Sequence, residues 1–330
     1  GAPAAQAAKP APLRSFNNQT IRMVVNTSIP GHAVRVELSN TFGKQLLKIG
    51  AANVALRDKG SAIVAASNRA LTFSGKAAAI IPAGGSILSD PVDLAVPAVG
   101  DLVVSVYLPE DSGPPTQHQT GLHSTYISGP GNFAADTDFK ADRTTFQWYF
   151  LSSVHVLAPA DTFAVVTFGD SITDGTLSTL NGDDRWPDVL SRRLHAAGRN
   201  VSVVNAGIGG NQVVGPDEYS AAKPFAGGPA ALQRLERDVL SLSGVATVIW
   251  LEGINDLSMN GNRTAADVQR GMREGVQRIR AKIPGVHVVG ATLTPALEST
   301  NGAHGSAQQD REQRVVRHFQ LHACTPFFPG

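Results

Sequence analysis

The spacing of apolar residues changes near residue 160, and this change limits the folds that the chain can adopt. From Thr20 to about Pro159, apolar and polar residues alternate in short runs such as TIRMVVNTS, AVRVELSN and DLVVSVYL. A period of two indicates β-strands. After Asp161, an apolar segment, a glycine-rich turn and a stretch of helical periodicity follow one another several times. We therefore expect the 330 residues to form two domains of different class.

The first domain is expected at residues 16–159, after an Ala/Pro-rich leader at residues 1–15. Turn-forming residues at 30–31, 82–85 and 113–115 separate its predicted strands and leave almost no room for a long helix. Short strands joined by such turns are typical of an antiparallel β-sandwich or jelly roll. The leader itself is typical of a mature N-terminus left after signal cleavage, which predicts a secreted or periplasmic protein. A disordered leader or the remnant of a tag is the alternative.

The second domain is expected at residues 160–330. Its predicted strands cover residues 163–168, 201–207, 246–253 and 287–293, and its first three predicted helices cover 185–198, 229–242 and 265–283. Alternating strands and helices, with strands that are almost continuously apolar, indicate an α/β fold whose parallel sheet is covered on both faces. In such sheets the ligand lies beyond the carboxyl ends of the strands. The residues that follow each strand are therefore the candidate site.

The overall composition argues against several functions. Lysine and arginine number 28 against 27 aspartate and glutamate residues, so no net charge draws the chain to nucleic acid or to an anionic membrane. The longest apolar runs are far below the roughly 18 residues needed to cross a bilayer, so no membrane span is expected. Cys324 is the only cysteine, which excludes an internal disulfide and a cluster of thiolate metal ligands. A small, weakly charged substrate fits this composition.

The first predicted strand of the second domain is followed by Gly169-Asp170-Ser171-Ile172-Thr173-Asp174-Gly175. This places a serine hydroxyl at a strand-to-helix turn, where a nucleophile is exposed and free backbone N–H groups favour a developing oxyanion. The tripeptide Gly-Asp-Ser alone is a weak signal. The alternative is an ordinary turn in which Ser171 is the N-cap of the helix.

The second and third strands are followed by NAGIGGN, residues 205–211, and by GIND, residues 253–256. A glycine N–H and an asparagine amide are donors that acyl transfer requires around the oxyanion. Each segment alone could be a loop, since glycine and Asn-Asp are common in turns. Three such segments after three parallel strands are brought to one edge of the sheet by the topology.

Together, GDSITDG, NAGIGGN and GIND resemble the first three signature blocks of the GDSL/SGNH hydrolases. The resemblance implies a flavodoxin-like SGNH hydrolase domain in which Ser171 is the nucleophile, Gly210 rather than Gly207 is a backbone oxyanion donor, and Asn255 is the side-chain donor. RWPDVLSRRL, FNNQTIRMVVNTS, VELSNTFG and ILSDPVDLAVP resemble a bacterial subgroup with a β-rich N-terminal domain. Members of that subgroup are acyl or carbohydrate esterases.

The fourth signature of the family, an Asp-x-x-His that supplies the base and its orienting acid, does not occur after Ser171. A serine hydroxyl needs such a base to become a good nucleophile. Three histidines occur late in the chain: His304 is expected in a loop, His318 on a helix and His322 in the tail LHACTPFFPG. None of them has an aspartate three residues before it. We therefore expect an incomplete or frame-shifted C-terminus that begins near Arg317. His118 and His123, in the first domain, lack a third zinc ligand and are expected to be structural.

Two functions remain open. The first is a serine esterase that forms an acyl-enzyme on Ser171, acts on acetyl or other short acyl esters of small molecules or carbohydrates, and needs no metal or organic cofactor. The intact Ser171, Gly210 and Asn255 favour it. The second is a glycan-binding protein with an impaired hydrolase domain, which the missing Asp-x-x-His favours.

Overall fold

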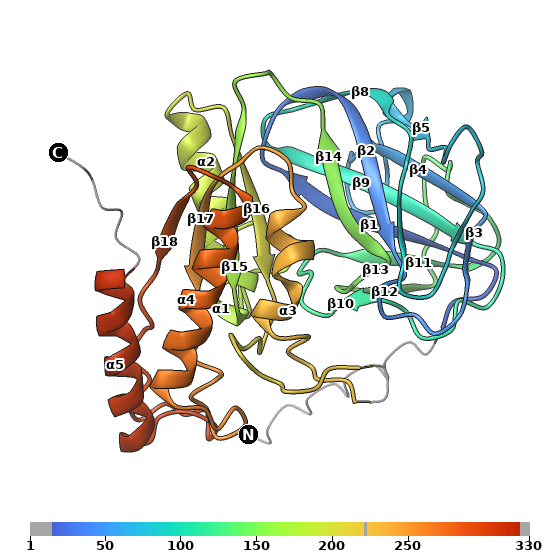
Figure 1. The fold of residues 1–330 in the computed structure, drawn as a ribbon. Coiled ribbons are helices and arrows are strands. Elements are labelled where there is room, and N and C mark those ends of the chain that lie inside the picture. Colours follow the sequence, from blue (N-terminus) through green and yellow to red (C-terminus); the bar gives the residue numbers. More distant parts are fainter. Residues whose placement is uncertain (1–14, 221–222, 324–330) are drawn as a thin grey trace, which may run out of the picture.

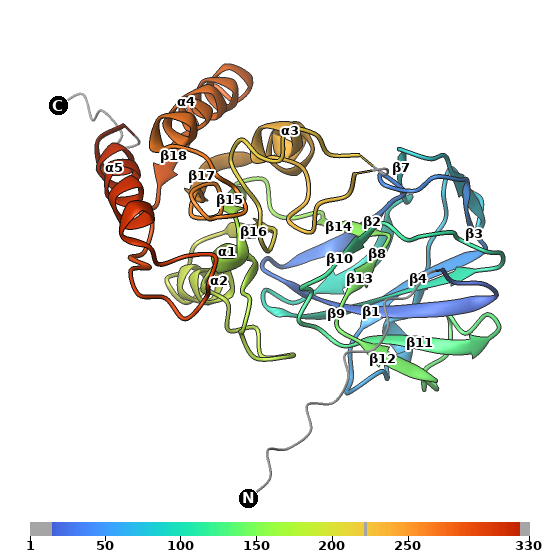
Figure 2. The ribbon, with the colours of Figure 1, turned by 90° about the horizontal axis from the view of Figure 1, so that it is seen from below.

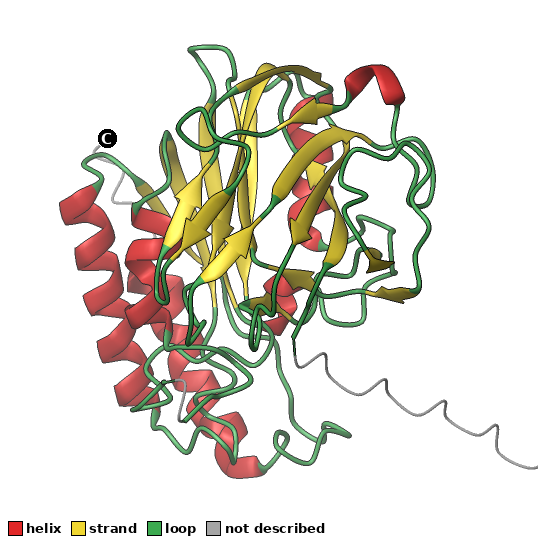
Figure 3. Ribbon diagram, turned by 90° about the vertical axis from the view of Figure 1, so that its right-hand side faces the viewer, coloured by secondary structure: helices red, strands yellow, loops and turns green. Residues whose placement is uncertain are grey.

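The computed structural model describes residues 15–220 and 223–323. Residues 1–14 of the predicted leader and the tail 324–330 lie outside the described residues. A β-rich part (residues 16–159) packs beside an α/β part (residues 160–323), as Figure 1 shows in blue to green and in green to red. In the described residues of the β-rich part, the strands are accompanied by one short helical turn, Ala65–Ser67 (Figure 3). This agrees with the absence of long helices predicted from its turns.

Antiparallel pairing dominates the β-rich part. One sheet has the strand order β12-β11-β1-β9-β4-β5, a second joins β14, β2, β7 and β8, and two smaller pairs are β3-β6 and β10-β13. The strands are β1 (Gln19–Thr27), β2 (Gly31–Ser39), β3 (Leu47–Ile49), β4 (Ala51–Leu56), β5 (Arg69–Ala70), β6 (Ala79–Ile81), β7 (Ser86–Leu88), β8 (Val92–Val96), β9 (Gly100–Leu108), β10 (Gln117–His118), β11 (Thr125–Pro130), β12 (Arg143–Thr145), β13 (Trp148–Tyr149) and β14 (Leu151–Val156).

The two larger sheets share one apolar core. Ile21 and Met23 of β1 belong to the same buried cluster as Val34 and Val36 of β2, although β1 and β2 lie in different sheets. Burying apolar side chains between the sheets removes them from water, which is the main favourable contribution to folding. The alternation seen in the sequence therefore corresponds to strands that turn apolar side chains toward this common core.

The α/β part is built on one parallel sheet with the order β16-β15-β17-β18. These strands are β15 (Phe163–Gly169), β16 (Val201–Gly207), β17 (Val245–Leu251) and β18 (His287–Gly290). In chain order this is second, first, third, fourth, the order of flavodoxin-like sheets. Among the described residues, β18 forms the edge of the sheet and ends three residues earlier than the sequence predicts.

Helices cover this sheet on both faces. They are α1 (Ser171–Asp174), α2 (Trp186–Ala196), α3 (Ala231–Leu235), α4 (Ala265–Lys282) and α5 (Ala307–Ala323), and a π-helical turn (Glu236–Leu240) directly continues α3. Figure 2 shows α2 on one face, α3 and α4 on the other, and α5 near β18. The start of α4 is fixed by a capping box between Thr264 and Asp267. The sequence predicted one regular helix where α3 and the π-helical turn lie.

Candidate active site

Three strands of the parallel sheet end at the same level, and the loops that follow them lie together. Gly169 of β15 is in register with Gly207 of β16 on one side and with Leu251 of β17 on the other. A Cβ at Gly169 would lie 2.3 Å from the Leu251 carbonyl oxygen, so this position requires glycine. The Ile208 N–H donates to the Gly169 carbonyl at 3.0 Å and joins the first two loops. The predicted convergence of the first and second loops is therefore present.

Ser171 is the first residue of α1. Asp170 is the N-cap of this helix, because its backbone is extended and its carboxylate accepts the Ile172 N–H at 3.0 Å. The alternative in which Ser171 is the N-cap is therefore wrong: the residue before it takes that position. The Ser171 side chain is half-buried, and its hydroxyl makes no hydrogen bond to another described residue. The hydroxyl is thus available to a ligand.

The glycines after β16 differ in what their N–H groups do. The Gly207 N–H donates to the Asn205 side chain at 2.9 Å, and the Gly209 N–H donates to Asp174 Oδ2 at 2.8 Å. Gly210 has a positive φ of 81°, which favours glycine, and its N–H has no partner among the described residues. Of these three glycines, Gly210 therefore has the free backbone donor.

Asn255 follows β17 and contacts the loop after β16. Its Nδ2 donates to the Asn211 carbonyl at 2.9 Å, which uses one of the two amide hydrogens and leaves the other for a ligand. The neighbouring Asp256 carboxylate accepts the N–H groups of Val213 at 2.8 Å and Val214 at 3.0 Å. These bonds hold the second and third loops in one arrangement, so Ser171, Gly210 and Asn255 belong to a single cluster of connected loops.

A buried arginine that the sequence analysis did not identify lies beneath these loops. The Arg234 side chain of α3 is 1% exposed, and its guanidinium carbon lies 4.1 Å from the centre of the Phe168 ring. Its N–H groups donate to Gly169 O at 2.9 Å, Ala206 O at 2.7 Å, Asn211 Oδ1 at 2.7 Å and Asp238 Oδ2 at 3.0 Å. One side chain thus joins the ends of β15 and β16 to the loop that carries Gly210.

Three carboxyl groups near the loops have raised pKa values. Desolvation by burial raises the pKa of Asp170 to about 7, that of Glu252 to about 8 and that of Asp256 to about 6. Glu252, which follows β17, accepts the Trp250 Nε1–H at 2.7 Å and lies 4.0 Å from Arg234. At neutral pH the Glu252 carboxyl is therefore mostly protonated.

No hydrogen bond joins His304 to the Ser171 side chain among the described residues. The loop that carries His304 lies against the loop after Asn255, since the Met259 N–H donates to the Ala303 carbonyl at 3.1 Å. Burial lowers the pKa of His304. His318 lies on α5, which continues past Arg317 to Ala323. The side chain of His322 and the tail that contains Cys324 lie outside the described residues.

The two histidines expected to be structural bridge the two parts of the chain. His118 Nε2 donates to Asp174 Oδ1 at 2.8 Å, and His123 Nε2 donates to Asp183 Oδ1 at 2.6 Å. His123 and Asp183 also lie near Asp101, and together these three could offer ligands to a metal ion. However, the Asp101 carboxylate already accepts hydrogen bonds from Asn26 and Arg57, and the positive charge of Arg57 opposes a cation. We assign no metal to this group.

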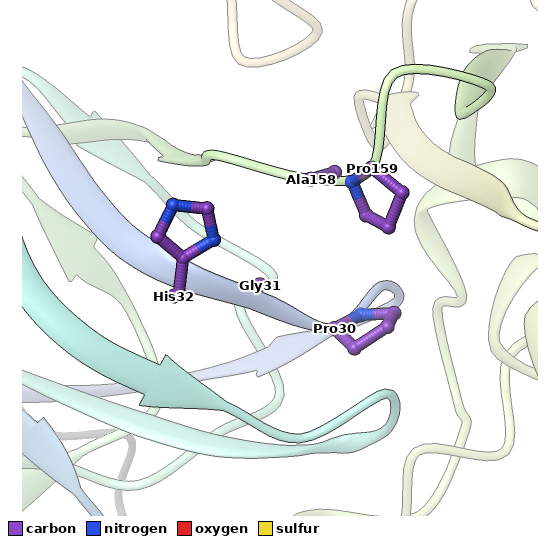
Figure 4. A pocket seen from close by; sticks show the side chains of 5 residues that line it. All are labelled: Pro30, Gly31, His32, Ala158 and Pro159. Atoms are coloured by element: carbon purple, nitrogen blue, oxygen red, sulfur yellow. The ribbon is translucent and has the colours of Figure 1, made fainter.

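Two further features lie away from the cluster. A surface hollow lined by Pro30, Gly31, His32, Ala158 and Pro159 precedes β15, at the end of the strand opposite to Ser171 (Figure 4). This hollow is therefore not the place where the predicted site residues converge.

In the part of the chain that the structure describes, no helix combines the length and apolar character that a bilayer span requires.

The second half of the chain is similar to known proteins. Residues 167–329 match the model of the GDSL-like lipase/acylhydrolase family. Among solved structures, a lipase/acylhydrolase from Enterococcus faecalis is similar at 24% identity over 50% of this chain and 74% of that one, with a TM-score of 0.38. A carbohydrate acetylesterase from Sinorhizobium meliloti is similar at 18% identity over 50% and 83%, with a TM-score of 0.39. No curated protein sequence matches the chain. The chain therefore contains a GDSL-like lipase/acylhydrolase domain at residues 167–329.

Proposed function

We propose that this chain is a serine esterase of short-chain acyl esters, with acetyl esters, including those of carbohydrates, as the main candidates. The observation that supports it is the arrangement at the strand ends: a free Ser171 hydroxyl, a free Gly210 N–H and an Asn255 amide on connected loops. Membership of a lipase/acylhydrolase family supports the same reaction class. The nearly balanced charge of the chain fits a small or carbohydrate ester better than a nucleic acid.

In the proposed mechanism, Ser171 Oγ attacks the ester carbonyl and forms a tetrahedral intermediate. The Gly210 N–H, the Ser171 N–H and the Asn255 amide donate to its oxyanion. The alcohol leaves, and water then releases the acid from the acyl-enzyme, with no metal or organic cofactor required. The proton from Ser171 needs an acceptor, and the sequence after Ser171 contains no Asp-x-x-His to supply it. The second candidate is therefore a glycan-binding protein with weak or no hydrolysis.

The test compares Ser171→Ala and Asn255→Ala with the wild-type protein on a chromogenic acetyl ester. Ser171→Ala should lower kcat by several orders of magnitude, because the nucleophile is lost. Asn255→Ala should lower kcat by about 10²-fold to 10³-fold with little change in KM, because its amide binds mainly to the oxyanion. Initial rates over a range of ester concentrations check both predictions.

Ser178→Ala and Asn260→Ala are matched controls, since both lie in neighbouring loops and neither side chain makes a hydrogen bond among the described residues. Labelling of Ser171 by a fluorophosphonate, followed by peptide mass spectrometry, identifies the nucleophile independently of turnover. Unchanged hydrolysis in Ser171→Ala would rule out the esterase mechanism. Glycan binding without Ser171-dependent hydrolysis would establish the second candidate.

We also propose the domain organisation expected from the sequence: a β-sandwich at residues 16–159 and a hydrolase domain at residues 160–330. The apolar core shared by two antiparallel sheets supports the first, and the family match supports the second. The Ala/Pro-rich residues 1–15 support a secreted or periplasmic location. Fractionation of producing cells tests the location, and recovery of the protein solely in the cytoplasm would refute it.

A further inference from the structure

One segment of the β-rich part, residues 117–124, lies directly on α1 and the loop after it. Besides His118 and His123, its contacts are Gly121 O with Arg185, Leu122 O with the Asn181 N–H at 2.9 Å, and the Ser124 N–H with Asn181 Oδ1 at 2.8 Å. Figure 1 shows β10, which begins this segment, on the side of the β-rich part that faces α1 and α3. The segment is thus attached to the α/β part by several independent hydrogen bonds.

The contact nearest to Ser171 centres on the Asp174 carboxylate. Asp174 ends the helix that Ser171 begins, and it is 4% exposed. Its Oδ1 accepts the His118 Nε2–H at 2.8 Å, and its Oδ2 accepts the Gly209 N–H at 2.8 Å. One buried carboxylate therefore connects the nucleophile helix, the loop of the free Gly210 N–H, and a histidine from the β-rich part.

Thr120 of the same segment also lies beside Gly209. A Cβ at Gly209 would lie 3.5 Å from Thr120 Oγ1, an ordinary van der Waals distance, and 3.3 Å from Asp174 Oδ2. The residue after Gly209 is Gly210, whose N–H must point to a fixed place to stabilise an oxyanion. The covering segment and the Asp174 carboxylate together restrict the peptide that precedes this donor.

The His118 ring is itself held by the β-rich part. His118 is paired with Trp148 across β10 and β13, and the two rings are tilted with their centres 5.9 Å apart. Trp148 Nε1 donates to the Val24 carbonyl of β1 at 2.9 Å. Through Trp148, the imidazole of His118 is therefore connected to β1 of the six-stranded sheet, which belongs to the β-rich part and not to the loops of the candidate site.

Removing His118 would leave one oxygen of a buried carboxylate without its partner. Such a group is costly, so Asp174 is expected to rotate or to admit water, and its bond to the Gly209 N–H is expected to weaken. We propose that His118 is a positioning residue for ester hydrolysis: through Asp174 it fixes the Gly209-Gly210 backbone so that the Gly210 N–H meets the oxyanion. This proposal rests on the proposed function. It makes the β-rich part a component of the active site.

The experiment compares His118→Ala, His118→Gln and the control His155→Ala in the full chain. His155 lies on β14 of the same β-rich part and bonds to Ser153. His118→Ala should lower kcat by about 10-fold to 10²-fold, as expected for a small displacement of a catalytic donor, with KM nearly unchanged. His118→Gln should retain most of the activity, because the glutamine amide can donate to Asp174 Oδ1. His155→Ala should resemble the wild type.

A second measurement does not depend on turnover. Amide hydrogen exchange of residues 207–211 should be faster in His118→Ala than in the wild type and in His155→Ala, with cooperative thermal unfolding showing that each variant is folded. Unchanged exchange in this segment would overturn the proposal, as would faster exchange with unchanged kcat. Equal losses in the alanine and glutamine variants would also overturn it. If the wild-type protein does not hydrolyse esters, the proposed function fails instead, while the exchange data still show whether His118 holds the loop.

Discussion

Each of the two parts of the molecule buries an arginine, and the two arginines have different surroundings. Arg22 of β1 and Arg234 of α3 are 0% and 1% exposed, and each lies over a phenylalanine ring. Both also use several guanidinium N–H groups as hydrogen-bond donors. The planar fork of arginine suits such a role, because it offers several donors in fixed directions.

Arg22 connects neutral atoms of the neighbouring strand β9 and of two loops. It donates to Ser105 Oγ at 2.8 Å, Ser61 O at 2.8 Å, Ala134 O at 3.4 Å and Asp136 O at 2.7 Å. Burial lowers its pKa to about 10, and the Asp136 carboxylate acts in the opposite direction. None of its partners lies near the parallel sheet. Arg22 therefore holds the chain around one sheet together.

Arg234 connects the loops of the candidate site. Its partners include Gly169 O, immediately before Asp170 and Ser171, and Asn211 Oδ1, immediately after Gly210. The Asp238 carboxylate pairs with it at 3.0 Å. The difference teaches that burial and hydrogen-bond number do not by themselves distinguish structure from function. The two arginines differ in which parts of the chain they hold in place by hydrogen bonds.

Of the changes that test this comparison, Arg234→Lys is expected to have the largest effect. The lysine keeps the charge but has one ammonium group, so it cannot reach both Gly169 O and Asn211 Oδ1 with the geometry of the guanidinium. We expect kcat to fall by about 10²-fold, because displaced strand ends misplace the nucleophile and its donors. Ester hydrolysis measured well below the melting temperature, with near-UV circular dichroism as a check of folding, tests this. Activity close to that of the wild type would remove the distinction between the two arginines.

Arg22→Lys provides the matched comparison, with a smaller effect on activity. Unpaired buried acceptors cost about 1 to 3 kcal/mol each, so the melting temperature should fall by several degrees. The kcat per folded molecule should stay near that of the wild type, because no partner of Arg22 touches Ser171, Gly210 or Asn255. Thermal unfolding and initial rates on the same samples measure both quantities. A loss of kcat equal to that of Arg234→Lys would contradict the comparison.

Much of the fold could be predicted from apolar periodicity. The predicted strand 201–207 has the bounds of β16, because an apolar run between turn residues defines it. The predicted strand 287–293 was too long: β18 ends at Gly290, which is paired with Trp250 near the end of β17. The Ala291 N–H still donates to the Trp250 carbonyl at 3.0 Å, but β17 ends at Leu251 and the chain turns at Gly253, whose φ is 120°, so little of the neighbouring strand remains for pairing. The sequence of one strand does not show where the neighbouring strand in the sheet ends.

The site was predicted less completely. Ser171, Gly210 and Asn255 stand in recognisable segments after strands, and topology brings such segments together. Arg234 was missed because an arginine on a helix is usually exposed, and only the tertiary structure shows that its helix faces the strand ends. The contact of His118 with Asp174 joins positions far apart in the sequence, and no local pattern encodes it. The periodicity of apolar residues therefore could not predict these polar contacts between residues far apart in the sequence.

The smallest expected effect concerns the charge balance around Arg234, and it is tested by Glu252→Gln. Glu252 is completely buried, and desolvation raises its pKa from 4.5 to about 8, although Arg234 acts in the opposite direction. Between pH 4.5 and about pH 8, Glu252 holds a proton in the folded protein that it has lost in the unfolded chain. The contribution of Glu252 to stability is therefore fully present below pH 4.5 and is lost as the pH rises through about 8.

Glutamine does not ionise, and its carbonyl can still accept the Trp250 Nε1–H. The free energy of unfolding of Glu252→Gln should therefore increase relative to that of the wild type as the pH rises from about 5 to about 9. Asp170 and Asp256 titrate in both proteins, so their effects largely cancel in this difference. Denaturant unfolding at several pH values measures the differences. A difference for Glu252→Gln that stays constant with pH would mean that Glu252 remains ionised beside Arg234, so that the arginine of the site, unlike Arg22, is balanced by two carboxylates, Glu252 and Asp238.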